Sequence, residues 1–206
     1  MAQLPVIDFT GWKDPSGYRL AKTDGFLRVV RNGRPKDPLE VARPLDQTPE
    51  LFRIFASRVT KDLDVLAFVQ RYGPLTFYAN TPGDIIEEVL FHARTMRSLL
   101  NSFSGQLWKP DLAGKFDALP SCTLHAAVVW DHVKKSLRWE LRPSTLLDGL
   151  WLQFGQAVTR GAHIRACAHC GEWFETGAGT GRRLDAKFCC DEHRTSFNSL
   201  KRSREK

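Results

Sequence analysis

Long apolar runs and abundant cysteine are both missing from this sequence. An uninterrupted apolar run of about 18 residues, the length that a membrane-spanning helix needs, occurs nowhere in the chain. The five cysteines are an odd number and four of them lie between residues 167 and 190, which argues against a disulfide framework. The first residues lack the basic and apolar stretches of a secretory signal. We therefore expect a protein of the reducing cytoplasm without membrane association.

The sequence also lacks the patterns that are typical of enzymes. The glycine-rich stretch at 177–181 is followed by two arginines rather than by a helix after a strand, so it does not fit a phosphate-binding loop. Glu87 and Glu88, like Asp131 and His132, are adjacent and point in different directions on a helix, whereas acid/base catalysis needs convergent groups. We expect no catalytic site.

What the chain does contain is enough apolar surface for a core, and a basic C-terminal end. Hydrophobic residues make up 42% of the 206 residues and aromatic residues 11%, as in globular proteins. The net charge is +7, and the part of the chain from Arg160 onward holds ten Lys and Arg against six Asp and Glu. This uneven excess indicates a polyanionic partner, most plausibly nucleic acid.

Four potential metal ligands in the last quarter have a regular spacing. Cys167 and Cys170 are separated by two residues on a turn that ends at Gly171, and Cys189 is followed four positions later by His193. Residues at i and i+4 lie on one face of a helix. Thiolate and imidazole are the ligands that tetrahedral zinc prefers. The spacing C-x2-C-x18-C-x3-H therefore predicts one Zn²⁺ ion, which is structural because four protein ligands leave no open position for water.

Two neighbouring residues offer alternative ligands. His169 lies between the first two cysteines, and Cys190 follows Cys189 directly. We prefer Cys189 with His193, because a helix can aim that pair at one ion.

The hydrophobic periodicity predicts a mainly α fold with short β elements (α+β), in which a helical N-terminal domain precedes a treble-clef zinc finger. Residues 1–48 are expected to be irregular with two or three short strands, 49–160 a mainly helical domain, and 162–206 the finger with a basic C-terminal helix. Helices are predicted to begin near Leu51 and after the N-caps Thr60, Thr81 and Ser144, and a strand covers 137–141. The apolar run at 124–130 is compatible with helix or strand.

Within the finger we expect a knuckle, a hairpin and a helix. Trp173 and Phe174 would form the first hairpin strand, 177–183 its tip and 187–190 the returning strand, with the helix beginning at about Asp191. Phe197 and Leu200 lie one turn apart and are expected to pack against Trp173 and Phe174.

Basic and amide side chains on the hairpin and helix form the candidate nucleic-acid surface. Lys and Arg neutralise phosphates, while an Asn or Arg reaches base edges. The alternative is a solvated helical face. The candidate residues are Arg182, Arg183, Lys187, Arg194, Asn198, Lys201, Arg202 and Arg204.

The segments 167–174 (Cys-Ala-His-Cys-Gly-Glu-Trp-Phe) and 188–194 (Phe-Cys-Cys-Asp-Glu-His-Arg) resemble bacterial zinc-finger proteins of the CGNR type. The resemblance extends less specifically to 66–73 and 146–154. It departs from the family pattern in two places: His193 replaces the fourth cysteine, and Arg-Thr-Ser at 194–196 replaces the Gly-Asn-Arg signature.

The resemblance implies a helical N-terminal domain that senses a ligand or partner, a C-terminal treble-clef finger, and regulation of transcription through DNA. Any base-reading role of the missing signature is not carried over. We therefore expect a bacterial zinc-finger regulator that binds nucleic acid, most plausibly DNA. Because one finger buries little surface, specific binding is expected to need a homodimer or a second contact region. The alternative is a protein-interaction adaptor with a purely structural finger.

Overall fold

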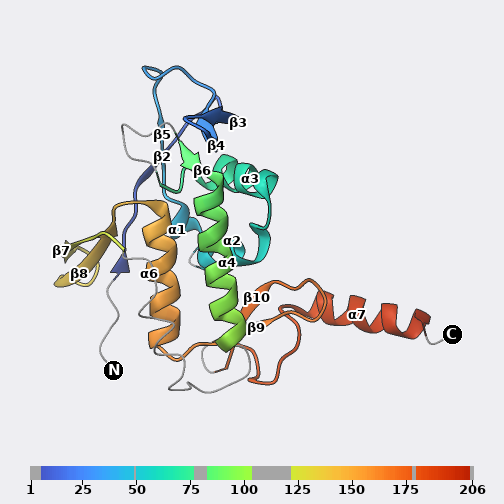
Figure 1. The fold of residues 1–206 in the computed structure, drawn as a ribbon. Coiled ribbons are helices and arrows are strands. Elements are labelled where there is room, and N and C mark those ends of the chain that lie inside the picture. The colour runs from blue at the N-terminus through green and yellow to red at the C-terminus, as the bar shows by residue number, and fades with distance from the viewer. Residues whose placement is uncertain (1–5, 49, 77–82, 104–121, 178–179, 205–206) are drawn as a thin grey trace.

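The computed structural model describes residues 6–48, 50–76, 83–103, 122–177 and 180–204 (Figure 1). Within these ranges the chain forms six helices and ten strands, and the strands are distributed over four small sheets. Among these helices none is long and apolar enough to cross a membrane.

The helices follow the predicted periodicity closely. They are α1 (Pro44–Gln47), α2 (Leu51–Arg58), α3 (Asp62–Tyr72), α4 (Ile86–Phe103), α6 (Leu146–Thr159) and α7 (Asp191–Arg204). Thr81 itself lies outside the described residues, but Asp84 and Ile85 form a strand and α4 begins only at Ile86, so the helix predicted to follow Thr81 starts later than expected.

Side-chain caps set the starts of α3 and α6. The Asp148 carboxylate accepts hydrogen bonds from the Thr145 N–H at 3.1 Å and the Thr145 hydroxyl at 2.8 Å, and the same hydroxyl accepts from the Asp148 N–H. In α3 the Asp64 carboxylate accepts from the N–H and hydroxyl of Thr60. The reciprocal bonds at α6 satisfy donors that a helix start leaves unpaired, whereas the N-cap of α3 is Lys61, so the predicted cap at Thr60 is one residue too early. The predicted cap at Ser144 is therefore one residue too early.

The strands are short, and three of their six pairings join segments that are distant in the chain. They are β1 (Val6–Ile7), β2 (Gly11–Lys13), β3 (Tyr18–Thr23), β4 (Phe26–Arg31), β5 (Glu40–Ala42), β6 (Asp84–Ile85), β7 (Leu124–Asp131), β8 (Ser136–Pro143), β9 (His163–Ala166) and β10 (Trp173–Thr176). The sheets have the orders β1-β8-β7, β3-β4-β6, β2-β5 and β10-β9. The open prediction at 124–130 resolves as a strand, and the strand predicted at 137–141 is confirmed.

The predicted fold class, a helical N-terminal domain followed by a treble-clef finger, is wrong. Five strands lie in the first 48 residues, and β1 runs parallel to β8 with Val6 opposite Glu140, while β4 pairs with β6 beside α4. Phe9, Tyr18 and Val29 lie in the same apolar core as the helices. The N-terminal strands are therefore part of the core, and their distant pairing leaves no mark in local periodicity.

The core is built where α2, α4 and α6 meet. Phe52 and Phe55 of α2 and Phe154 of α6 are fully buried, as are Met96 and Leu100 of α4. The rings of Phe52 and Phe154 meet edge to face with centroids 6.0 Å apart, an arrangement that stabilises aromatic pairs.

A buried carboxylate fixes the N-terminal turns. Asp14 accepts hydrogen bonds from Arg31 Nε at 3.0 Å and from the backbone N–H groups of Ser16 at 2.8 Å and Gly33 at 3.0 Å. Burial raises the pKa of Asp14, but these three donors outweigh burial and lower that pKa below its usual value. The ionised carboxylate is therefore the form that the fold stabilises.

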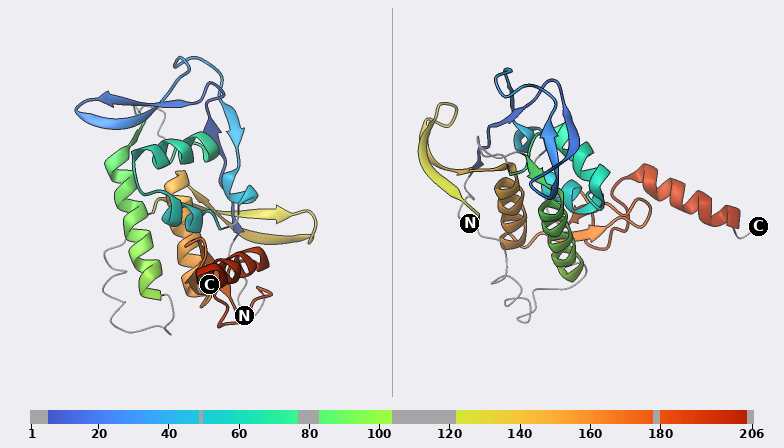
Figure 2. Two further views of the ribbon diagram at one scale, coloured as in Figure 1. Left: turned by 90° about the vertical axis from the view of Figure 1, so that its right-hand side faces the viewer. Right: turned by 45° about the horizontal axis from the view of Figure 1, so that its top comes forward.

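The hairpin β9–β10 is joined to the body of the protein. β9 contacts α4 and β10 contacts α2, and Ile164 and Trp173 belong to the main apolar core. The Trp173 N–H also donates to Ser57 Oγ at 3.4 Å, and Arg58 forms an ion pair with Glu172. In contrast, α7 extends away from the body, as Figure 1 and the right-hand view of Figure 2 show.

The hairpin predicted for the C-terminal region is also wrong. β10 pairs with β9, which precedes Cys167, so the Cys167–Cys170 turn is the turn of the hairpin itself. Residues 187–190 form no strand, and the bridge Gly177–Arg182 is isolated. The strand that pairs with β10 is therefore β9, which comes before the Cys167–Cys170 turn, and not residues 187–190.

Candidate metal centre

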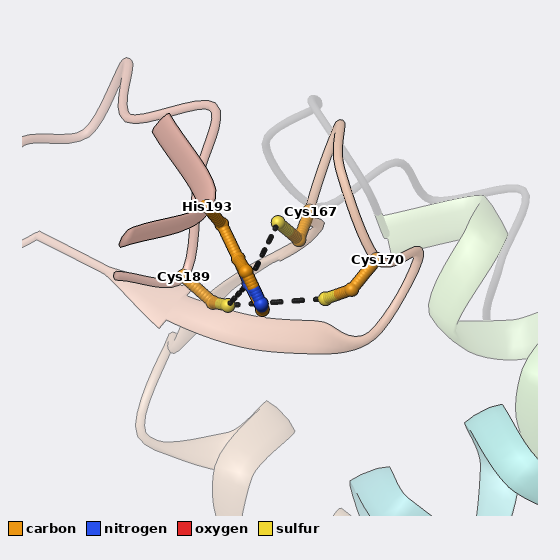
Figure 3. A group of neighbouring side chains, drawn as sticks. All are labelled: Cys167, Cys170, Cys189 and His193. Carbon is orange, nitrogen blue, oxygen red and sulfur yellow. Dashed lines mark hydrogen bonds between the residues drawn. The ribbon is translucent and has the colours of Figure 1, made fainter. Parts of the chain in front are cut away.

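Four side chains from two parts of the chain point toward one another (Figure 3). Cys167 and Cys170 lie on the β9–β10 turn, whereas Cys189 lies two residues before α7 and His193 lies in its first turn. Their ligand atoms all lie within 4.8 Å of one another. The structure thus gathers the four residues whose spacing predicts a metal site.

Two of the ligand–ligand distances in this group suit a tetrahedral ion. Bond lengths of about 2.3 Å to sulfur and 2.0–2.1 Å to nitrogen imply ligand–ligand separations of about 3.6–3.8 Å. The distance from Cys170 Sγ to Cys189 Sγ is 3.9 Å, and that from Cys167 Sγ to His193 Nδ1 is 3.8 Å. Cys189 Sγ and His193 Nδ1 are closer, at 2.9 Å, so these two atoms must separate by roughly 0.7 Å around such an ion. The Cys3His group could hold a metal ion after this small adjustment.

Backbone hydrogen bonds build the turn that carries the first two cysteines. The Gly171 N–H donates to the Cys167 carbonyl at 2.8 Å, and Gly171 has φ +74°, a conformation that favours glycine. The Cys167 N–H donates to Glu172 O at 2.9 Å, and the Ala168 N–H to Lys187 O at 2.9 Å. The last bond ties the turn to the segment that delivers Cys189.

The three thiols do not ionise equally. Burial opposes ionisation of Cys167, but the N–H groups of Cys170, Cys189 and His169 outweigh it and lower the pKa of Cys167 to about 6. Burial and the neighbouring Cys167 thiolate raise the pKa of Cys170 and of Cys189. A divalent cation would reverse this repulsion, because metal ligation deprotonates thiols outright.

The alternative ligands lie beside the group of four. The His169 ring lies against the His193 ring with centroids 4.8 Å apart, and Cys190 Sγ is 4.0 Å from Cys189 Sγ. Neither belongs to the set of mutually close ligand atoms found in the described part of the chain.

The candidate basic residues of the loop before α7 are held by neighbouring groups. Arg182 Nε donates to Cys189 O at 3.1 Å and its guanidinium lies over the Phe174 ring, 5.8 Å from the centroid. Arg182 thus links the backbone of Cys189 to Phe174 of the hairpin, a contact that sequence reasoning missed because no local pattern marks it. Arg183 pairs with Asp185 at 3.1 Å, and the side chain of Lys187 is exposed.

A groove of about 710 Å³ separates this loop from the first turn of α7. Its charged lining residues are Arg182, Arg183, Lys187, Arg194, Asp185, Asp191 and Glu192. Since Arg183 pairs with Asp185 and Arg194 pairs with Asp191, each at 3.1 Å, the groove carries little net charge. It is a weaker candidate for a polyanion than the rest of α7.

The remaining candidates share one face of α7. Arg194, Asn198, Lys201 and Arg202 have the spacing i, i+4, i+7 and i+8, and all four are exposed. The side chain of Arg204 lies outside the described residues.

The predicted packing of Phe197 and Leu200 against Trp173 and Phe174 is wrong. The Phe197 ring lies against Phe188 instead, with centroids 5.3 Å apart, and Leu200 is 55% exposed. The reason is that α7 points away from the hairpin rather than folding back over it (Figure 2).

Comparison of the chain with protein-family models, with curated proteins and with solved structures gives no match. Function is therefore inferred from the residues and their geometry.

Proposed function

We propose that this chain is a zinc-finger nucleic-acid-binding protein that regulates transcription, in which α7 contacts DNA. The observation that carries the proposal is the position of α7, which leaves the body and presents a basic, fully exposed face (Figures 1 and 2). An α-helix such as α7 fits into the major groove of DNA, which accommodates one α-helix.

The ion that we propose is a single structural Zn²⁺. Three thiols and one imidazole are the ligand types of structural zinc sites. Cys167, Cys170, Cys189 and His193 would fill all four positions, so no site for an activated water would remain. The role of the ion is then to hold α7 against the β9–β10 hairpin.

Charge along α7 supports contact with phosphate groups. Its acidic residues, Asp191 and Glu192, are confined to the first turn, where the helix dipole favours negative charge. Beyond them Lys201 and Arg202 provide positive charge and Asn198 an amide that can pair with adenine. The end of the helix farthest from the body is therefore the basic end.

The experiment that tests the proposal measures binding across a salt series. Fluorescence anisotropy of labelled, mixed-sequence DNA and RNA duplexes is recorded with zinc-loaded protein at increasing salt. The test variant is Lys201→Ala/Arg202→Ala. The matched control, Lys22→Ala/Lys36→Ala, removes the same charge from exposed positions near β3 and β4.

Each phosphate contact contributes about −0.9 to the slope of log K against log salt. We expect the slope of the Lys201/Arg202 variant to be smaller than that of wild type by roughly 2, and the control slope to be unchanged. Absence of binding at low salt, or an equal loss in the control, would refute the proposal. Tighter binding to the RNA duplex would reassign the partner from DNA to RNA.

A second function, as a protein-interaction adaptor, is favoured by the apolar side of α7. Phe197 and Leu200 are exposed on the side of the helix away from Asn198. A protein partner would be expected to bind there with little dependence on salt, and Leu200→Ser would weaken that binding while leaving the nucleic-acid slope unchanged.

Sensing of a small molecule is not part of the proposal. The hollow lined by Ile54, Phe68 and Tyr72 between α2 and α3 has a volume of about 240 Å³. Pockets for small molecules are typically about 300–1,000 Å³, so this hollow is too small to support a ligand site.

A further inference from the structure

The hairpin β7–β8 has one entirely apolar face. Its register places Val128 opposite Trp139 and Trp130 opposite Leu137. Residues two apart on a strand share a face, and directly opposite residues share it as well. These four side chains therefore form one continuous surface, which we call the hairpin face.

The hairpin face is turned toward solvent. Val128 is 53% exposed, Trp130 51%, Leu137 68% and Trp139 62%. Figures 1 and 2 show the hairpin reaching out from the body, on the side away from α7. A sheet that packs on a core normally directs its apolar face inward, so this hairpin has the reverse orientation.

The opposite face of the hairpin explains the reversal. Glu140 on that face is only 3% exposed and is paired with Arg142 Nε at 2.8 Å and Arg138 at 3.5 Å. Shifting the register by one residue would place Glu140 in solvent and Trp139 inside, but the pairing of β8 with β1 fixes the register. The outward direction of both tryptophans is thus part of the fold.

We propose that the hairpin face is a homodimer interface, on which the same face of a second copy of this chain packs. The exposed part of these side chains amounts to on the order of 500 Å² per chain, given the roughly 150–250 Å² that each aromatic side chain presents. Two copies would bury about 1,000 Å², the size at which specific association begins.

The chemistry of the face fits a second copy. A twofold interface must be self-complementary, and a surface without charged groups meets that condition because no like charges oppose each other. On this face of β7 the smaller residues Ala126 and Val128 precede Trp130. Each tryptophan of one copy therefore has a shallow position to fill on its partner, as in packed sheets whose side chains interdigitate.

The experiment is analytical ultracentrifugation of the full zinc-loaded chain, from about 1 to about 200 µM, a range that covers micromolar affinities. The disruptive variant is Trp130→Ser/Trp139→Ser, and the conservative variant is Trp130→Phe/Trp139→Phe. Trp12→Ser is the matched control, since Trp12 is 48% exposed on β2 in a different sheet. Thermal unfolding and metal content are measured for every variant to establish that each is folded.

We expect wild type, the Trp12 control and the phenylalanine variant to reach twice the mass of one chain. Buried interface tryptophans contribute heavily to affinity, so the serine variant should raise the dimer Kd by more than about 30-fold. If the serine variant is unfolded, the single variant Leu137→Lys, which places a charge in the face, must give the same loss.

A wild type that stays monomeric at every concentration would overturn the inference, whether the face is then covered by another protein or by a lipid surface. A dimer that survives in the folded serine variant would overturn it as well. Because no nucleic acid is present, this result is independent of the proposed function.

Discussion

Replacing Cys170 by Ser should release α7 from the β9–β10 hairpin and unfold the helix while leaving the body folded. Cys170 is exposed, so its substitution removes one ligand without opening a cavity. The two parts depend differently on the ion, since Ile164 and Trp173 anchor the hairpin in the core, whereas the described side chains of α7 after His193 are all exposed. Without the ion, the ring contacts that support the helix among the described residues are those of Phe197 with Phe188 and of His193 with His169.

The size of the effect follows from the length of α7. An isolated helix of fewer than about 12–15 residues is marginal in water, and α7 has 14 residues. Its melting should remove about a fifth of the helical signal of the described chain. Loss of a second-shell partner typically costs 10–100-fold in metal affinity, so loss of a ligand should cost more than about 100-fold.

The assay combines circular dichroism at 222 nm with metal release followed by a chromophoric chelator. Cys190→Ser is the matched control, because this thiol lies 4.0 Å from Cys189 Sγ but outside the group of four. We expect the control to retain one ion per chain and full helicity. Removal of the ion from wild type by a chelator should lower the helical signal to that of the Cys170 variant. Addition of zinc to the chelated wild type should restore the signal.

Two results would contradict this reasoning. Loss of nearly all helicity on chelation would mean that the core itself needs the ion. Equal metal affinity in the Cys170 and Cys190 variants would mean that the ligands are not the four residues that the geometry selects.

Three further predictions concern stability, each measured by urea unfolding. Asp14→Asn should lower the free energy of unfolding by about 2 kcal/mol at pH 7. Because the folded pKa of Asp14 is lowered, the difference in stability between variant and wild type should shrink as pH falls below about 4 toward that pKa. A difference that does not change with pH would refute the role of the ionised carboxylate. Trp173→Ala should lower the free energy of unfolding by about 3–5 kcal/mol, whereas Arg58→Ala, which removes an exposed ion pair, should lower it by less than about 1 kcal/mol. A larger loss in the Arg58 variant would show that the ion pair, and not the buried tryptophan, attaches the hairpin to the body. Gly83→Ala should cost more than about 2 kcal/mol, because Gly83 has φ +120° and a Cβ there would collide with Val29 O; Gly155→Ala, with open space in α6, should be neutral or stabilising.

The sequence predicts the cluster of four potential metal ligands well because their spacings are local. Cys167 and Cys170 lie on one turn and Cys189 and His193 on one helix start, so each pair is positioned within a few residues. Only the distance between the two pairs depends on the tertiary fold. The combination of three thiols and one imidazole, which suits a single metal ion, predicts that the two pairs come together.

The sheets could not be predicted in the same way. The partner of Val6 is Glu140 and the partner of Arg28 is Ile85, and no local pattern identifies partners so distant. Period-two alternation at Leu137 and Trp139 indicates a strand, but alternation alone does not reveal which face meets solvent. The buried position of Glu140 decides this, and it depends on β1 and two arginines.

The division of the four ligands between two parts of the chain has a mechanical consequence. Cys167 and Cys170 belong to a hairpin fixed in the core, whereas Cys189 and His193 belong to the base of α7. An ion held between them would be a joint, and α7 an arm about 21 Å long. A tilt of about 10° at the joint would move the far end of this arm by about 4 Å. Ions that prefer different coordination geometries would therefore aim the arm in different directions, so the identity of the metal would be expressed as the direction of the helix.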